Sequence, residues 1–259
     1  MLLEDRIAIV SGVGPGMGRD IALAFAREGA DVVLAARSAA QLESVAQELR
    51  ALGRRALCVR TDIAQPDQCK HLAAAARAEF GRIDVLVNNA FKGGAEPTIE
   101  DASMAEWRTI FEVNVFGSVQ LSQAVVPYMK AQGGGSIIFI NSMSMRIIEP
   151  GFGGYAASKG ALMTAAQTMA KELGADNIRV NSVVPGYIWG PALQGYFRLL
   201  AQQQKTTPEA IYAGIASRTA LNRIPTSAEI ARAVVFFASD LSRVITGQAL
   251  DVNAGHFLH

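Results

Sequence analysis

Little in this chain could support a disulfide scaffold, a metal centre or a surface for polyanions. Its 259 residues include two cysteines and three histidines, and 24 basic side chains nearly balance 23 acidic ones. Two cysteines cannot cross-link a scaffold, and their scarcity is typical of a reducing compartment. The histidines have no ligand spacing relative to the cysteines, so we expect no metal. A net charge of +1 gives no electrostatic footprint for nucleic acid, so we expect no nucleic-acid partner.

Long apolar runs are missing as well. No stretch approaches the ~20 uninterrupted apolar residues of a membrane helix, so we expect no membrane partner. The first six residues combine acidic and basic side chains where a secretory signal would need an apolar run. These absences predict a cytoplasmic protein. With 50% apolar and 18% charged residues, the chain can bury the core of one large α/β domain, and wholesale disorder is excluded.

Short apolar runs alternate with amphipathic segments throughout the chain. Strands are predicted at 7–10, 32–36, 56–60, 83–87, 137–140, 180–183 and 248–252. Apolar strands separated by amphipathic helices are typical of a parallel sheet that is covered on both faces. Right-handed crossovers then make the sheet doubly wound. We therefore predict a single α/β domain over residues 1–259, with seven parallel strands and helices on both faces.

Segment 190–223 breaks this rhythm. It is rich in Gln, Thr and Tyr and is expected to hold two short helices. It follows the carboxyl end of a strand, which is where α/β sheets bind ligands. We predict a substrate lid here, with an ordinary surface excursion as the alternative.

A glycine cluster follows the first predicted strand. Gly12, Gly16 and Gly18 have the spacing G-x-x-x-G-x-G and open the first helix. Glycine allows a sharp turn and a close approach to phosphate, while the helix N-terminus supplies free N–H groups and a favourable dipole. The strand, turn and helix together predict a dinucleotide phosphate site rather than a structural turn alone.

The end of the second strand points to the nucleotide that is bound. An acidic residue there would hydrogen-bond the adenosine ribose and favour NAD. The chain instead has Ala35 and Ala36, followed by Arg37. A small neutral residue leaves room for a 2′-phosphate, and an arginine can bind it bidentately. This pattern favours NADP(H), with NAD(H) as the alternative.

A tyrosine and a lysine are spaced for one helix face. Tyr155 and Lys159 are at i and i+4, so their side chains lie together. A tyrosine hydroxyl has a pKa of ~10 and is a poor base, but a neighbouring ammonium favours the phenolate. Ser142 follows the strand at 137–140, so it can meet both side chains at the same sheet edge.

Five motifs in this order resemble those of the short-chain dehydrogenase/reductase family. They are Ser11-Gly12-x-x-x-Gly16-x-Gly18, Asn88-Asn89-Ala90 with Asn114, Ser142, Tyr155-x-x-x-Lys159 and Pro185-Gly186. The resemblance covers nearly the whole chain. It implies a Rossmann fold and hydride transfer between a nicotinamide and a carbonyl carbon.

The resemblance also implies roles for individual residues. Tyr155 would be the general acid/base, Ser142 would bind the substrate oxygen, and Lys159 would bind the nicotinamide ribose and lower the tyrosine pKa. Asn114 would hold a water of the proton relay. The expected nucleotide contacts are Gly12, Gly16, Met17, Gly18, Arg37, Asp62, Ile63, Asn88, Ala90, Tyr155, Lys159, Pro185, Gly186 and Ile188.

Three positions depart from the family pattern. Ser11 replaces the usual threonine, a mild change that keeps the hydroxyl. Phe91 replaces the usual glycine after Asn-Asn-Ala and puts an aromatic ring near the active-site floor. Gly190 replaces a threonine that often binds the carboxamide, so part of the nicotinamide anchoring is missing or comes from the lid.

Large apolar side chains cluster around the predicted site. The candidates for the substrate pocket are Phe91, Met143, Met145, Phe152, Tyr187, Trp189 and Tyr196. They favour a bulky apolar ketone or secondary alcohol, such as a cyclic, aromatic, terpenoid or steroid-like compound. The alternatives are reduction of a 3-ketoacyl thioester and a non-catalytic protein that senses NADP(H).

The resemblance implies a homotetramer, and a dimer is the alternative. The expected interface helices are 154–173 and 104–130, with small residues that allow close approach.

Overall fold

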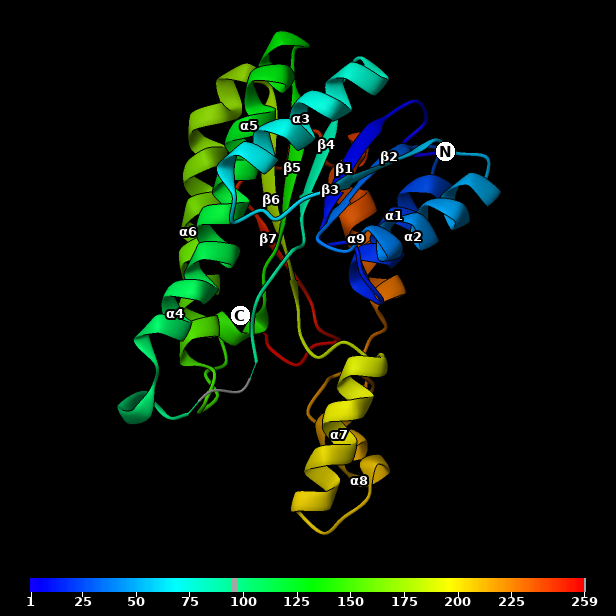
Figure 1. The fold of residues 1–259 in the computed structure, drawn as a ribbon. Coiled ribbons are helices and arrows are strands. Elements are labelled where there is room, and N and C mark those ends of the chain that lie inside the picture. The colour runs from blue at the N-terminus through cyan, green and yellow to red at the C-terminus, as the bar shows by residue number, and fades with distance from the viewer. Residues whose placement is uncertain (95–96, 259) are drawn as a thin grey trace.

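The computed structural model describes residues 1–94 and 97–258, and shows a central parallel sheet between two layers of helices (Figure 1). The strands are β1 (Ile7–Ser11), β2 (Asp31–Ala36), β3 (Ala56–Arg60), β4 (Val85–Asn88), β5 (Gly135–Ile140), β6 (Ile178–Pro185) and β7 (Ala249–Val252). They pair in the order β3-β2-β1-β4-β5-β6-β7, each pair in parallel. The predicted doubly wound, seven-stranded parallel sheet is confirmed.

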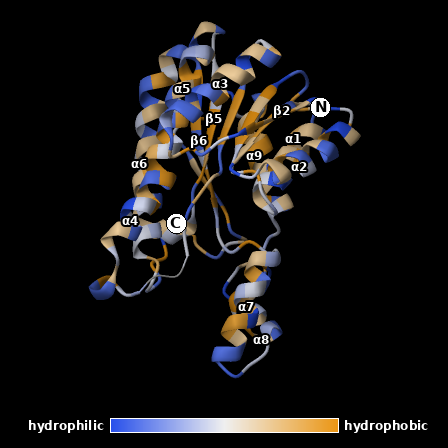
Figure 2. Ribbon diagram, in the orientation of Figure 1, coloured by the Kyte–Doolittle hydropathy of each residue, from blue (hydrophilic) through white to orange (hydrophobic). Residues whose placement is uncertain are grey.

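Helices cover both faces of this sheet (Figure 1). One core cluster lies under α1 (Met17–Arg27), α2 (Ala39–Ala51) and α9 (Ser227–Ala238). The other lies under α3 (Pro66–Phe80), α5 (Ser118–Ala131) and α6 (Gly153–Leu173). Figure 2 shows apolar residues along the strands between these layers. Residues of β1 and β4 are buried throughout, which explains their continuous apolar runs.

Strand order decides where a ligand can bind. The chain runs from β1 to one sheet edge and then returns to β4, on the other side of β1. The crossovers after β1 and β4 therefore leave in opposite directions, and α/β sheets bind ligands in the crevice at such a point.

The predicted helical stretch 104–130 is interrupted. It consists of α4 (Met104–Phe111), a π-helical turn (Glu112–Gly117) and α5. The turn contains Asn114, and π-helical turns occur frequently at functional sites. A wider helical turn re-aims the side chains within it, which the hydrophobic period does not reveal.

Segment 190–223 forms a helical hairpin beyond the carboxyl edge of the sheet (Figure 1). Its helices are α7 (Pro191–Gln203) and α8 (Pro208–Ala216). They enclose a small core of their own around Phe197, Ile215 and Ile224. The two expected helices are confirmed. None of the described helices is long and apolar enough to cross a bilayer.

Candidate active site

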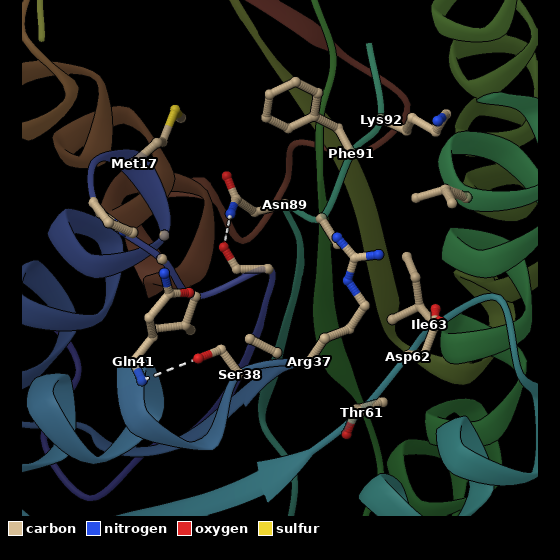
Figure 3. Close-up of a pocket in the computed structure, with 18 of the residues that line it drawn as sticks. Met17, Arg37, Ser38, Gln41, Thr61, Asp62, Ile63, Asn89, Phe91 and Lys92 are labelled. Atoms are coloured by element: carbon tan, nitrogen blue, oxygen red, sulfur yellow. Dashed lines mark hydrogen bonds between the residues drawn. The ribbon is translucent and has the colours of Figure 1, made fainter. Parts of the chain in front are cut away.

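A cavity of about 610 Å³ lies at the carboxyl ends of the central strands (Figure 3). Its lining includes the glycine loop after β1, the residues that follow β2 and β3, and segment 89–93 after β4. Seven of the predicted nucleotide contacts are among its lining residues, namely Gly12, Met17, Gly18, Arg37, Asp62, Ile63 and Ala90. The glycine motif and the second-strand motif therefore meet at one site.

Two positions of the glycine loop have no room for a side chain. Gly12 has a φ of +72°, and a Cβ atom there would lie 2.4 Å from the Ala90 Cα atom. At Gly18 a Cβ would lie 2.4 Å from the Gly12 carbonyl oxygen. Gly16 is the N-cap of α1, with a φ of +105° and no side-chain cap. The N–H groups of the first turn of α1 are thus left for an anion, which fits a pyrophosphate.

Asn89 holds this loop in place, although the sequence analysis gave the role at this motif to its neighbours. Its amide nitrogen donates to the carbonyl oxygens of Gly12 (2.9 Å) and Ser11 (3.2 Å). The Asn88 side chain, in contrast, donates to Ser122 on α5 at 2.9 Å and is buried. The Asn88 side chain is therefore used within the helical layer, so the prediction that Asn88 lines the adenosine side can hold only through its backbone.

Three more of the predicted nucleotide contacts are at the end of β6 or just after it. Pro185 ends the strand, and Ile188 packs against the core beside α1 and α9. A Cβ at Gly186 would lie 2.9 Å from Asn253 and 3.0 Å from the Met143 sulfur. Close packing explains the glycine at this position.

Ser142, Tyr155 and Lys159 meet at the edge of this cavity. Segment 91–93, which lines the cavity, lies against Tyr155, because a Cβ at Gly93 would be 2.6 Å from the tyrosine ring. The Lys159 ammonium lies 5.6 Å from the centre of that ring and donates to the Ile140 carbonyl oxygen at 2.8 Å. The predicted helix spacing thus places both side chains on one face.

Ser142 is oriented by Ser144. The Ser142 hydroxyl oxygen accepts bonds from the Ser144 amide (3.2 Å) and hydroxyl (3.0 Å). A hydroxyl that already accepts two bonds is left with its own proton to donate. That hydrogen bond reaches Tyr155 and lowers the tyrosine pKa.

Burial outweighs the other effects on both ionisable groups. It raises the pKa of Tyr155 above its ordinary value, and the hydrogen bond with Ser142 only partly opposes it. Burial also lowers the pKa of Lys159 to about 7. The sequence analysis expected the lysine to lower the tyrosine pKa. That effect stays a prediction, while burial is the largest cause of the Tyr155 shift and the Lys159 ammonium lies over the tyrosine ring.

Replacing Lys159 with methionine is expected to change how stability depends on pH. In the folded protein Lys159 loses its proton near pH 7, whereas in the unfolded chain it holds the proton up to about 10.5. The unfolded state therefore binds more protons between these values, and the free energy of unfolding of the wild type rises with pH by up to ~1.4 kcal/mol per pH unit. Denaturant titrations between pH 7 and 10 should show a rise in the difference between wild type and Lys159→Met. Lys171→Met, on the exposed side of the same helix, is the control, and a pH-independent difference would contradict the expected shift.

Asn114 connects the π-helical turn to segment 91–93. Its amide oxygen accepts from the Lys92 N–H at 2.7 Å, and its amide nitrogen donates to the Lys92 carbonyl oxygen at 2.8 Å. The same nitrogen donates to Ser158 at 2.9 Å, and Ser158 donates to the Tyr155 carbonyl oxygen. The Asn114 side chain therefore holds two backbone segments near the tyrosine ring, one at Lys92 and, through Ser158, one at Tyr155 itself.

The predicted substrate-pocket residues divide into two groups. The Phe91 ring is exposed by 64% and lies 6.2 Å from the Tyr155 ring in an edge-on contact, and Met143 is buried beside Gly186. Trp189, in contrast, packs against Phe197 and Tyr212 within the hairpin core. Trp189 therefore contributes to the hairpin core while remaining partly exposed, and its place in the substrate pocket stays a prediction.

Four candidates for the substrate pocket remain. Tyr187 stacks on His256 with ring centres 5.9 Å apart, so a residue near the C-terminus joins the site. Sequence analysis considered His256 only as a metal ligand and gave no signal for this contact. Phe152 is the N-cap of α6, Met145 closes the short helical turn after Ser142, and Tyr196 lies on α7.

Comparisons with known proteins agree with this geometry. A sequence model of the family described as enoyl-(acyl carrier protein) reductase matches residues 12–256. The 7alpha-hydroxysteroid dehydrogenase of Escherichia coli K12 is 37% identical over 98% of this chain and 94% of its own. The structure of L-sorbose reductase from Gluconobacter frateurii with NADPH and L-sorbose has a TM-score of 0.93 at 33% identity, covering 99% of this chain and 98% of that one. A structure of 7alpha-hydroxysteroid dehydrogenase with NADH and 7-oxo glycochenodeoxycholic acid has a TM-score of 0.89 at 37% identity, covering 98% and 94%.

Proposed function

The chain belongs to the short-chain dehydrogenase/reductase family and is a nicotinamide-dependent oxidoreductase acting on CH–OH and C=O groups. Within that activity, we propose that it interconverts a bulky apolar secondary alcohol and its ketone, with NADP(H) as the preferred nucleotide. The observation that carries this proposal is the position of Tyr155 beside the cavity, hydrogen-bonded to Ser142 and with the Lys159 ammonium over its ring. These groups can move a proton at a carbonyl oxygen.

The cavity fits a nicotinamide dinucleotide. The first turn of α1 would bind the pyrophosphate through its N–H groups, and Gly12 and Gly18 let the backbone approach it. Asp62, Ile63 and Ala90 would contact the adenosine. When bound, the nicotinamide ring supplies or accepts the hydride.

The residues of this chain would handle the proton. Tyr155 donates its hydroxyl proton to the carbonyl oxygen in reduction and takes a proton from the alcohol in oxidation. Ser142 has one hydroxyl proton, which it donates to Tyr155 in this structure and would turn toward the same oxygen when substrate is bound, because Ser144 occupies its acceptor side. Lys159 binds the nicotinamide ribose and, with a pKa of about 7, exchanges protons readily near neutrality. Asn114 holds the backbone at Tyr155 through Ser158. We propose that it also holds a water of the proton relay.

The shape of the site supports an apolar substrate. Phe91 offers an exposed ring next to Tyr155, and Met143, Met145 and Tyr187 would line the approach from the ends of β5 and β6. Side chains of this kind favour burial of hydrocarbon over binding of a polyhydroxylated compound. The hairpin at 190–223 would close over such a substrate as a lid.

The assembly and location that follow from the family remain part of this proposal. α4, α5 and α6 would form the contacts of a homotetramer, or of a dimer, and the protein would act in the cytoplasm. Size measurement by light scattering tests the assembly directly.

Binding and turnover together test the proposed function. Thermal unfolding is measured with NADPH or NADH at increasing concentration, since a ligand bound only by the folded state raises the midpoint. Turnover is then screened with cyclic and aromatic ketones, with an acetoacetyl thioester for the rival reaction. We expect tighter NADPH binding and reduction of the bulky ketones. Exclusive turnover of the thioester would overturn the substrate class, and nucleotide binding without any turnover would favour the sensor.

A further inference from the structure

Two arginines lie at neighbouring strand ends beside the adenosine side of the cavity. β2 and β3 pair in parallel, and their last residues, Ala36 and Arg60, are partners in the register. Arg37 follows Ala36 directly. The Arg60 Nε atom donates to the Arg37 carbonyl oxygen at 3.1 Å. This bond fixes the start of the Arg60 guanidinium and leaves its two terminal nitrogens free to bind something else.

A second cavity lies beside these two arginine side chains. It has a volume of about 400 Å³ and is lined by Arg37, Arg60, Asp62 and Gln68. Arg37 and Asp62 also line the larger cavity, so the two spaces adjoin. Figure 3 shows Arg37 extending from the end of β2 toward the middle of the larger cavity, near Asp62. Arg37 therefore borders both the nucleotide cavity and the second cavity, which Arg60 also lines.

The other polar groups of the second cavity are largely engaged. One Asp62 carboxylate oxygen accepts from the Ala64 N–H at 3.1 Å. The Gln68 side-chain oxygen accepts from the Asp62 N–H at 2.7 Å, which leaves the Gln68 amide NH₂ to donate. The cavity thus offers two guanidinium groups and an amide donor, against a single carboxylate.

Neither arginine has a carboxylate partner. Within the described residues, no acidic oxygen lies within 4.0 Å of Arg37 or Arg60, whereas Arg19, Arg50 and Arg54 each form an ion pair. Two neighbouring cations without a counter-charge favour binding of an anion between them.

The end of β2 adds no negative charge. The first turn of α2 contains no acidic residue, and its N-cap Ser38 accepts from the Gln41 N–H. The dipole of α2 also favours an anion at this end. An anionic group reaching out from an adenosine ribose in the larger cavity would therefore enter a positive environment.

We propose that Arg60 is a specificity-determining residue that binds a phosphate ester on the 2′-hydroxyl of the adenosine ribose, on the side opposite Arg37. Two guanidinium groups contact one phosphate, and Gln68 adds a neutral donor. Arg60 lies at the end of the third strand rather than the second, so preference for the phosphorylated nucleotide depends on the pairing of two strands. The inference rests on the proposed function, since it requires the adenosine to lie in the larger cavity.

The test uses two probes that differ only in the 2′-phosphate, adenosine 2′,5′-bisphosphate and adenosine 5′-monophosphate. Calorimetric titration gives their Kd values for the wild type, Arg60→Ala, Arg60→Lys and Arg37→Ala. We expect Arg60→Ala to weaken the bisphosphate about tenfold or more, as charge-assisted hydrogen bonds do, and to leave the monophosphate within about twofold. Arg60→Lys keeps the charge without the fork and should fall between. Arg37→Ala should also act on the bisphosphate alone, and the double variant should lose less than the product of both effects, because the two residues share one phosphate.

Salt and a distant variant separate charge from structure. Binding of the bisphosphate should weaken more steeply with NaCl than binding of the monophosphate, and Arg60→Ala should reduce that difference. The control is Arg77→Ala, an exposed arginine near the end of α3, which should change neither probe. Equal effects of Arg60→Ala on both probes, or none on either, would overturn the role of Arg60 while the proposed function stands. Failure of the wild type to bind NADPH, NADH and both probes would overturn both.

Discussion

Replacing Tyr155 with phenylalanine is expected to lower kcat about a thousandfold and to leave nucleotide binding unchanged. Positioned general acids and bases contribute about 10²–10⁴-fold to rate, and this substitution removes only the hydroxyl that carries the proton. The ring remains, and with it the edge-on contact with Phe91 and the close packing on Gly93. A ketone found in the screen serves as substrate, and nucleotide-dependent thermal stabilisation measures binding on the same samples.

A matched change elsewhere isolates this effect. Tyr128 is a half-buried tyrosine near the end of α5 that packs against the core cluster under α3, α5 and α6, and it is not among the predicted site residues. Tyr128→Phe removes the same atom, and it should keep turnover within about twofold of the wild type. Turnover of Tyr155→Phe within tenfold of the wild type would mean that another group transfers the proton, and the proposed mechanism would then be wrong.

Local patterns explain what the sequence could predict. The strand, glycine turn and helix around Gly12 are contiguous, so their residue types specify the loop without reference to the rest of the chain. Tyr155 and Lys159 share a helix face through spacing alone. The strands were recognisable because a sheet buried on both faces requires continuous apolar runs.

Features that depend on pairing or burial could not be predicted in the same way. The direction of the Asn88 side chain follows from the alternation of β4, which puts Ser122 rather than the cavity within its reach. The ring contacts of Trp189 with Phe197 and Tyr212 could not be predicted, because both partners come from later segments of the chain. The low pKa of Lys159 arises from desolvation beside the end of β5, and sequence spacing gives no measure of that burial.

The contact between Arg37 and Arg60 shows the same limit. The two residues are separated by a whole helix, and only the register of β2 and β3 brings them together. The sequence indicated the first arginine because it directly follows the second predicted strand, where the adenosine ribose is expected to bind. The second carries no local signal, so under our proposal the preference for NADP(H) would be encoded partly in strand pairing.

Replacing Gly12 with alanine is expected to weaken nucleotide binding by at least thirtyfold and to destabilise the fold by ~2 kcal/mol or more. The left-handed backbone conformation at φ +72° costs an L-residue about 1–2 kcal/mol. The added Cβ would also lie 2.4 Å from the Ala90 Cα atom and 2.5 Å from its nitrogen. Since both are backbone atoms, no side chain can rotate away, and the loop must move from the end of β4. The bonds from Asn89 to Ser11 and Gly12 would then be lost or lengthened.

Gly53 supplies the control for this change, because it separates backbone strain from the clash. Its φ is +76°, nearly the same as that of Gly12, yet no atom lies within 4 Å of an added Cβ. Gly53→Ala should therefore lower the free energy of unfolding by the strain alone and leave the Kd for NADPH unchanged. Denaturant unfolding and nucleotide titration on both variants measure the two effects. If Gly12→Ala kept its Kd within twofold of the wild type, close approach of this loop to Ala90 would not shape the nucleotide site, and the cavity would have to hold the pyrophosphate by other groups.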